Sequence, residues 1–417
     1  MSTATTTSEI PLVESDDLYR VFDHTDAPLG PDGTPYAYYE ALRDEAKRTP
    51  IGWSEAHGGF WVVASYEFCD SIIQDPVSFS NAAVTFPAYA TGQESALKIA
   101  GQDEPSHRRD RAFVVKPFSP RQVHKYEQLV ASMTGKLIDG FIESGRADLG
   151  QALGEEIPAR LTALLLGLPE EEGDTYRRWC WAMSHLHATD PAAAAGVVGE
   201  MHEYFGAVIE DRKRNPGEDV LSLVTHAEID GERLTDDDLL GFCIVLLIGG
   251  IDNSTKSLNA AFWRMGWDPE LRRRLIANPR LIDTATDEIL RYYTPGSIGR
   301  LVKEDITLGG VTMRKDDIAL LALPIANRDD RQFPYADTFV ADRTPNRHLG
   351  LGGGIHRCLG THLLRVEARA ALGEFLRRVP DYELDSTGRA TWVPGQVGGM
   401  ANVPVVFPAG KVEGGTA

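Results

Sequence analysis

Residues 351–360 read Leu-Gly-Gly-Gly-Ile-His-Arg-Cys-Leu-Gly, and a helical pattern follows them through about Phe375. This stretch predicts a glycine-rich loop that leads directly into a helix. At such a place the helix dipole and the free backbone N–H groups stabilise the thiolate of Cys358. The small residues that leave room for a flat ligand to approach the backbone are Gly352, Gly353, Gly354 and Gly360.

The chemistry of Cys358 has three interpretations at this point. A lone thiolate, with no second cysteine beside it, suits axial ligation of haem iron. A lone cysteine is most often a small buried hydrophobe, and a glycine loop before a helix can also bind phosphate. Phosphate is the weaker option, because the loop lacks both the Lys-Ser/Thr of a P-loop and a strand-flanked G-x-G-x-x-G.

Composition excludes several classes of protein. The 61 acidic and 42 basic side chains give a formal net charge of −19, which argues against nucleic acid or an anionic membrane as the main partner. No Cys-x-x-Cys pair occurs, so a zinc ribbon, a thiol-held iron–sulfur cluster and a disulfide scaffold are not expected. The four cysteines are Cys69, Cys180, Cys243 and Cys358.

No repeat and no Pro/Ser-rich linker divides the chain. We expect flexible ends at 1–15 and 409–417 around one domain at 16–408, mainly helical with a smaller β region. Helices are predicted at 35–48, 66–74 and 119–143, and a strand at 58–64. The N-terminus has no signal-peptide pattern, and the apolar run Cys243–Ile251 is too short to span a bilayer, which favours a soluble, cytoplasmic protein.

A helix of about 30 residues is predicted from Thr235 to Trp267, long enough at roughly 45 Å to cross a whole domain. Thr235 and the three acids after it favour the positive end of the helix dipole. Gly249 and Gly250 each cost about 1 kcal/mol inside a helix relative to Ala. They predict a local opening of the helix, with tight packing against another element as the alternative.

The sequence resembles the cytochrome P450 superfamily, specifically its soluble bacterial type. The family loop has the form Phe-x-x-Gly-x-x-x-Cys-x-Gly, and this chain has Leu351, Gly354, Cys358 and Gly360 at those positions. The resemblance implies a single, triangular, mainly α fold with a long central helix over the haem. It also implies haem b as the cofactor, with the Cys358 thiolate as its axial ligand.

Further matches follow in the family's order. Glu288 and Arg291 match the Glu-x-x-Arg pair whose ionic network ties a helix to the loop before the ligand cysteine. At least five other Glu-x-x-Arg matches occur, but only Glu288 is followed by Tyr292-Tyr293-Thr294-Pro295 and then Arg300. The approach to the haem loop is matched by Ala326-Asn327-Arg328-Asp329 and by Phe339, Asp342 and Arg343.

Four basic residues match positions that bind the haem propionates, namely His107, Arg111, Arg300 and His356. His107 and Arg111 are spaced i, i+4, so both can reach one partner from one helix face. Without the resemblance, these two would be read as surface residues.

The long helix matches the family's central helix, where an acid–alcohol pair normally delivers protons. This chain has Asp252 followed by Asn253. An amide can donate and accept hydrogen bonds but cannot rotate a hydroxyl proton into place. Asp252 is therefore expected to gate protons, and Asn253 to polarise or orient dioxygen.

The resemblance implies a monooxygenase that inserts one oxygen atom from O2 into a C–H bond. No flavin or iron–sulfur sequence is present, so a ferredoxin and its reductase are expected to supply electrons to a monomer. Basic residues that would form the docking patch are Arg108, Arg109, Lys116, Arg357 and Arg365.

The substrate pocket, by family position, includes Phe86, Val245, Gly249, Ile298 and Val397. These apolar or small residues favour a compact hydrophobic substrate, with monoterpenoids first and small aromatics or fatty acids next. The alternatives are a peroxide-using enzyme of the same fold and a haem-binding sensor or carrier without turnover. Known peroxide users tend to have Arg-Pro where Asp252 and Asn253 stand.

Overall fold

The computed structural model describes residues 18–413 except 31, 88–96, 187–189 and 389. The predicted flexible segment 1–15 lies outside the described residues. At the other end, residues 409–413 run along the helical part of the molecule, where Gly410 N–H donates to Ile142 C=O and Glu413 pairs with Arg377 at 2.6 Å.

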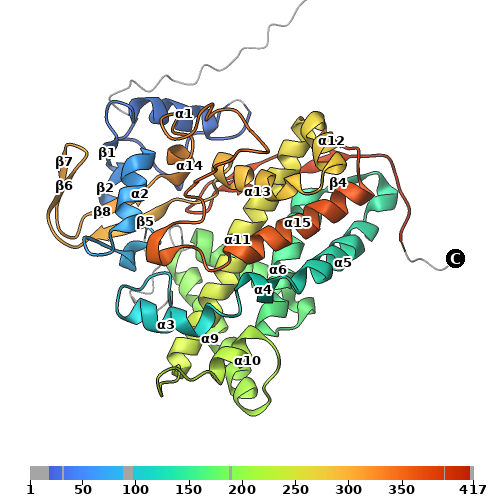
Figure 1. The fold of residues 1–417 in the computed structure, drawn as a ribbon, viewed down its shortest axis with the longest axis horizontal. Coiled ribbons are helices and arrows are strands. Elements are labelled where there is room, and N and C mark those ends of the chain that lie inside the picture. The colour runs from blue at the N-terminus through green and yellow to red at the C-terminus, as the bar shows by residue number, and fades with distance from the viewer. Residues whose placement is uncertain (1–17, 31, 88–96, 187–189, 389, 414–417) are drawn as a thin grey trace, which may run out of the picture.

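The architecture is mainly α with a smaller β region, as predicted, and Figure 1 shows a roughly triangular outline with α10 at its lower corner. The helices are α1 Tyr36–Glu45, α2 Tyr66–Gln74, α3 Ser106–Val114, α4 Pro120–Val123, α5 Tyr126–Asp139, α6 Glu156–Leu166, α7 Gly173–Trp181, α9 Pro191–Arg214, α10 Val220–Thr225, α11 Asp236–Trp267, α12 Pro269–Ala277, α13 Leu281–Tyr292, α14 Leu323–Ala326 and α15 Thr361–Arg378.

The strands of the main sheet and the β6–β7 hairpin gather at one side of the molecule, whereas β4 of a smaller sheet lies at the opposite side among the helices (Figure 1). The main sheet has the order β1-β2-β8-β5-β3, in which β2 and β8 are parallel and the other pairs antiparallel. Its strands are β1 Ile51–Ser54, β2 Phe60–Val63, β3 Phe79–Ser80, β5 Ile298–Val302 and β8 Ile318–Leu321. The smaller sheets contain β4 Arg146–Asp148, β6 Ile306–Leu308, β7 Val311–Met313, β9 Glu383–Leu384, β10 Trp392–Val393, β11 Gly399–Met400 and β12 Pro404–Val406.

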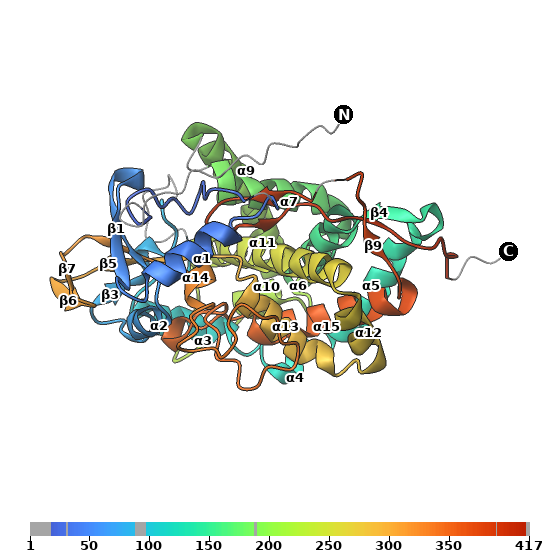
Figure 2. The same ribbon diagram turned by 90° about the horizontal axis from the view of Figure 1, so that it is seen from above.

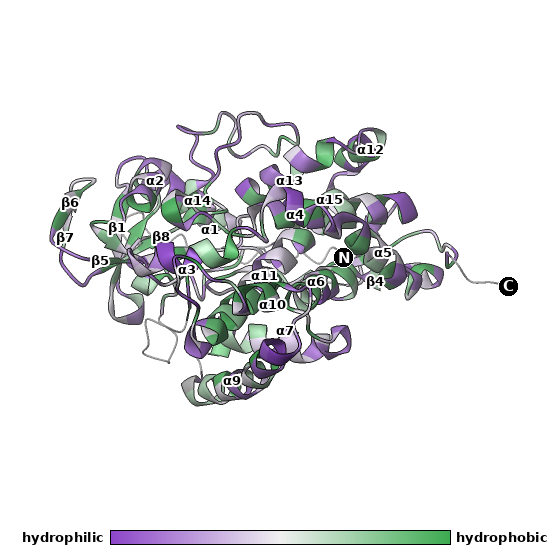
Figure 3. Ribbon diagram, turned by 60° about the horizontal axis from the view of Figure 1, so that its bottom comes forward, coloured by the Kyte–Doolittle hydropathy of each residue, from purple (hydrophilic) through white to green (hydrophobic). Residues whose placement is uncertain are grey.

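The central helix α11 begins as predicted, with a capping box between Thr235 and Asp238. It runs through the middle of the molecule between α9 and α13, as Figure 2 shows. By length and composition α11 could cross a membrane, but 61% of its most apolar window is buried inside the protein, as in the core helix of a globular domain. Figure 3 shows the contrast between a largely hydrophilic α3 and a largely hydrophobic α10.

Two predictions about helix continuity differ from the structure. The helix predicted over 119–143 is divided into α4 and α5, because the turn at His124 and Lys125 tightens and Glu127 N–H bonds to His124 C=O. The opening predicted in the long helix is wrong: α11 is continuous through Gly249 and Gly250. A Cβ at Gly250 would lie 2.5 Å from Thr162 Oγ1 on α6, so this glycine is there for close packing.

Candidate functional site

The Cys358 loop is shaped by its own backbone hydrogen bonds. Cys358 N–H donates to Leu351 C=O at 2.9 Å, which folds residues 351–358 back on themselves. Thr361 Oγ1 then donates to Cys358 C=O at 2.7 Å, and α15 begins at Thr361 with Gly360 as its N-cap residue. The cysteine thus lies three residues before the first residue of α15, close to the position that the sequence predicts.

Two glycines of this loop, Gly353 and Gly354, allow a neighbouring helix to pack closely. A Cβ at Gly353 would lie 2.8 Å from Ile73 Cγ2, and one at Gly354 would lie 2.8 Å from Ile73 C=O, both on α2. Gly354 also has φ +57°, a conformation that favours glycine. Our interpretation of these two glycines as room for a flat ligand is therefore corrected, since α2 already occupies that space.

Cys358 is the one exposed cysteine of the four, and all four are free thiols. Even so, burial by surrounding protein raises the pKa of its thiol, opposed by the Gly360 N–H and by the charge of Arg111. The thiol is therefore accessible while the rest of its surroundings are protein.

Four basic side chains converge beside this loop. The rings of His107 and His356 lie 4.1 Å apart between centroids, and Arg111 Nη2 donates to Arg357 C=O at 2.6 Å. Burial, followed by the charges of His107, Arg300 and Arg111, lowers the pKa of His356 to about 3. Burial also lowers the pKa of Arg300 to about 10. The structure therefore brings together residues that lie about 250 positions apart in the sequence.

This cluster fits a ligand with two carboxylates. Arg300 is 3% exposed and forms no ion pair with any described residue. His107 is 2% exposed, and its Nε2 finds no hydrogen-bond partner within the part of the chain that the structure describes. A buried guanidinium needs a compensating anion and a buried ring nitrogen needs a hydrogen-bond partner, and the propionates of haem would supply both. The residues present therefore fit haem b with Cys358 as the axial ligand.

The side chains of Asp252 and Asn253 lie in different surroundings, although the two residues are adjacent on α11. Asp252 is 8% exposed, and its Oδ2 receives no hydrogen bond from the described residues. Burial and then the charge of Asp252 raise the pKa of Cys180, and the same charge opposes the burial that lowers the pKa of His185. Both effects place Asp252 beside α7 and the π-helical turn after it. Asn253 Oδ1 lies instead 3.7 Å from where a Cβ of Gly296 would be, beside the turn that leads into β5.

The predicted pocket residues fall into three places. Gly249 is exposed although it lies in mid-helix, and nothing lies within 4 Å of a Cβ built on it. Val245 is one turn earlier on the same helix face and is half-buried. Ile298 begins β5, and Val397 is bridged to nearby Gly296. Phe86 differs, because its ring packs against Phe60 at 5.1 Å between centroids.

Glu288 and Arg291 form a fully buried bidentate ion pair, with N–O distances of 2.8 and 2.7 Å. The Glu288 carboxylate also accepts from Val340 N–H, Arg343 Nε and Asn346 Nδ2. Other Glu-x-x-Arg pairs, such as Glu270 and Arg273, are exposed. The buried pair joins α13 to the segment that precedes the Cys358 loop.

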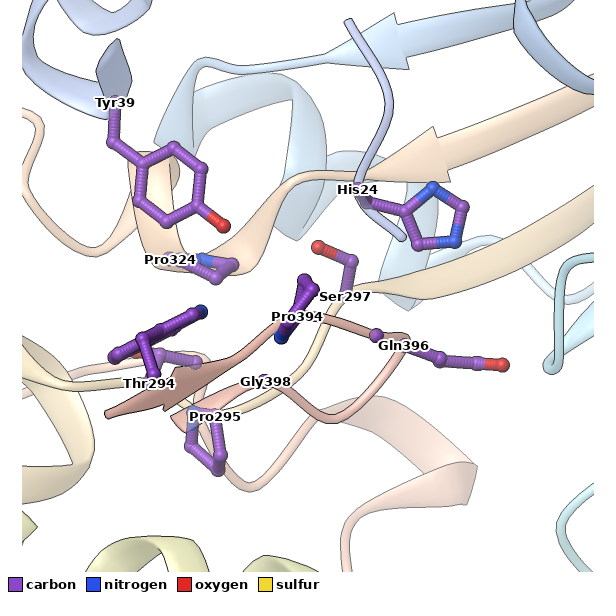
Figure 4. A pocket seen from close by; sticks show the side chains of 11 residues that line it. His24, Tyr39, Thr294, Pro295, Ser297, Pro324, Pro394, Gln396 and Gly398 are labelled. Carbon is purple, nitrogen blue, oxygen red and sulfur yellow. The ribbon is translucent and has the colours of Figure 1, made fainter. Parts of the chain in front are cut away.

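Two polar residues near these elements, Glu367 and His24, were missed by sequence reasoning. Glu367 on α15 is 3% exposed, and burial raises the pKa of its carboxyl to about 8. Gln396 and His24 line a pocket beside the turn into β5 (Figure 4). A glutamate in an amphipathic helix looks solvent-facing, and the targets of side-chain to main-chain bonds leave no pattern in a sequence, so no signal could have found Glu367 or His24.

The comparisons with known proteins agree with this geometry. The cytochrome P450 family model matches residues 186–380, which include α11, α13 and Cys358. The chain is 32% identical to the mycinamicin IV hydroxylase/epoxidase of Micromonospora griseorubida, over 83% of this chain and 89% of that protein. It is also 32% identical to the cytochrome P450 monooxygenase PikC of Streptomyces venezuelae, over 91% and 92% of the two chains.

Among solved structures, the chain resembles the Mycobacterium marinum cytochrome P450 CYP268A2 in complex with pseudoionone. The TM-score is 0.83 at 25% identity, and the match covers 93% of this chain and 99% of the other.

Proposed function

The chain belongs to the cytochrome P450 family of haem-thiolate monooxygenases, and on that premise we propose that it hydroxylates a small hydrophobic substrate, with a monoterpenoid favoured. The reaction consumes the substrate, O2, two electrons and two protons, and releases the alcohol and water. Bound haem with a thiolate ligand supplies the oxygen activation. The observation that carries the proposal is the buried basic cluster beside the accessible thiol of Cys358.

The protein's own residues have distinct parts in this proposal. Cys358 would hold the iron, while His107, Arg111, Arg300 and His356 would hold the propionates. Asp252 would pass protons from the α7 side of α11. Asn253, beside Gly296, would orient dioxygen by an amide hydrogen bond.

The substrate class rests on the surroundings of α11. Gly249 and Val245 present a small, apolar face, and Ile298 and Val397 would complete the wall. The similar structure that binds pseudoionone, a small apolar ketone, supports the same class. Phe86 stays in the proposed pocket, because its backbone segment would form part of the wall while its ring packs against Phe60.

Electrons would come from a ferredoxin and its reductase, in a monomeric cytoplasmic protein. Lys116 and Arg357 offer exposed charge near the Cys358 loop, and Arg108 has an 84% exposed side chain although it pairs with Glu104. Arg109 and Arg365 are paired with Asp110 and Asp287 and would contribute less.

Arg357→Glu should slow ferredoxin-driven reduction at low salt, whereas Arg314→Glu on the β6–β7 hairpin should not.

The first test is the spectrum of the reduced protein with carbon monoxide. A Soret band at the position typical of thiolate-ligated haem is expected, and Cys358→His should abolish that band while haem remains bound. Thiolate spectra that persist in the variant would refute the ligand assignment.

A second test is turnover of a terpenoid panel. Turnover with redox partners but not with peroxide would separate a monooxygenase from a peroxide user, and no turnover with either would favour a sensor or carrier.

A further inference from the structure

Gln396 joins three segments that are far apart in the sequence. It is buried, at 9% exposed, in the loop after β10, and it lines the same pocket as His24 and Ser297 (Figure 4). Its side-chain Oε1 accepts from Phe86 N–H at 3.1 Å, and its Nε2 donates to Val84 C=O at 2.6 Å. Its own C=O accepts from Ser297 N–H at 3.2 Å.

The segment around Phe86 is held from other sides as well. His24 Nε2 hydrogen-bonds Phe86 C=O at 2.6 Å, so both backbone polar groups of Phe86 are bound by distant side chains. Gly299 N–H donates to Val84 C=O at 3.2 Å. A Cβ at Gly299 would lie 2.1 Å from Ala83 C=O, so β5 and this segment touch backbone to backbone.

The three joined segments carry Phe86, Ile298 and Val397. These are the pocket residues that the proposed function places outside α11. Because buried side-chain amides with both ends bonded have little freedom to rearrange, Gln396 ties the three segments to one another. A fixed wall holds a substrate in one orientation, which is what selective oxidation requires.

We propose that Gln396 is a positioning residue for the substrate, which it orients by locking the Phe86 segment to the turn before β5 and to the Val397 loop. The inference rests on the proposed function. Gln396 itself need not touch the substrate, so a purely structural role would change stability but not ligand selectivity.

The experiment compares variants of the haem-loaded full-length protein. Gln396→Leu removes both side-chain bonds at similar volume, and Gln396→Glu keeps the acceptor for Phe86 N–H but cannot donate to Val84 C=O. The matched control is Asn402→Ala, which removes a side chain that accepts two bonds from Thr391 in the same C-terminal region. The readouts are amide hydrogen exchange in residues 79–87 and the dissociation constants of imidazole and 4-phenylimidazole from spectral titration.

In Gln396→Leu, exchange in 79–87 should accelerate about tenfold, and the ratio of the 4-phenylimidazole to the imidazole dissociation constant should shift about fivefold or more. Imidazole alone needs only the iron, whereas the phenyl group reaches the pocket wall. Gln396→Glu should fall between Gln396→Leu and wild type, and Asn402→Ala should match wild type in both readouts.

Two results would overturn the proposal. Unchanged exchange in 79–87 would show that Gln396 does not hold this segment. Faster exchange with an unchanged affinity ratio would show that the bonds are structural only. Failure of the proposed function looks different, since the wild-type protein would then show no thiolate-ligated haem spectrum.

Discussion

At the scale of single residues, Asn253 is the departure from the family pattern with the clearest chemical meaning. Its amide lies toward Gly296, while Asp252 lies toward Cys180 and His185. The two neighbours therefore face different parts of the protein, and proton transfer between them needs an intervening group such as water.

Asn253→Ala should raise the fraction of reducing equivalents lost as peroxide or water, because the amide that organises dioxygen is removed. The measurement is product formed per NAD(P)H consumed with redox partners. Asn253→Thr, which restores a hydroxyl, is the matched variant and should recover coupling. Equal coupling in wild type and Asn253→Ala would remove Asn253 from the mechanism.

Glu367 should make stability fall as pH rises. Its pKa is about 8 in the folded protein against 4.5 when unperturbed, so between those values the folded state binds the extra proton. The resulting loss in the free energy of unfolding is absent below about pH 4.5 and grows toward pH 8, to roughly 5 kcal/mol at most.

Glu367→Gln keeps the size of the side chain but cannot ionise. The free energy of unfolding of this variant should therefore fall less between pH 5 and pH 8 than that of the wild type. Denaturant unfolding of the haem-loaded protein at several pH values measures the difference. Glu383→Gln, at an exposed position, is the control. Parallel pH profiles for wild type and Glu367→Gln would contradict the prediction.

At the scale of elements, α11 contains two adjacent glycines with opposite surroundings. Gly250 admits Thr162 of α6, while Gly249 faces open space. Gly250→Ala should destabilise the protein by about 1–3 kcal/mol through overpacking. Gly249→Ala should be neutral or up to about 1 kcal/mol stabilising, because Ala favours the helix. Thermal unfolding distinguishes the two, and equal effects would count against this division.

The sequence predicted the bounds of an element best where a capping residue begins it and a helix-breaking residue ends it. α2 has the predicted bounds of Tyr66–Gln74, because Ser65 caps it and the Asp75-Pro76 pair ends it. The break between α4 and α5 has no such signal, since the apolar spacing continues through it. Within the site, the place of Cys358 just before a helix was predictable from its loop, but the meeting of His107 with Arg300 and His356 followed only from the family resemblance.

At the scale of the whole molecule, the Glu288–Arg291 pair connects α13 to the chain that leads into the Cys358 loop. Glu288→Gln leaves Arg291 and Arg343 buried without their carboxylate, which should cost about 3–5 kcal/mol of stability and impair haem retention. Glu270→Gln breaks an exposed pair and should cost about 0–1 kcal/mol. Comparable losses in denaturant unfolding would refute the distinction.

The parallel pairing of β2 with β8 has a consequence for synthesis. Trp61 is paired in register with Ala319, roughly 260 residues later, so β2 leaves the ribosome long before its neighbour exists. At about 5–20 residues per second the wait is on the order of ten seconds to a minute. During that time β2 has an unpaired edge, and its four-residue length limits the opportunity for wrong pairing. Because the sheet and the Gln396 contacts close last, a nascent chain cannot complete its ligand pocket until nearly all of it has been translated.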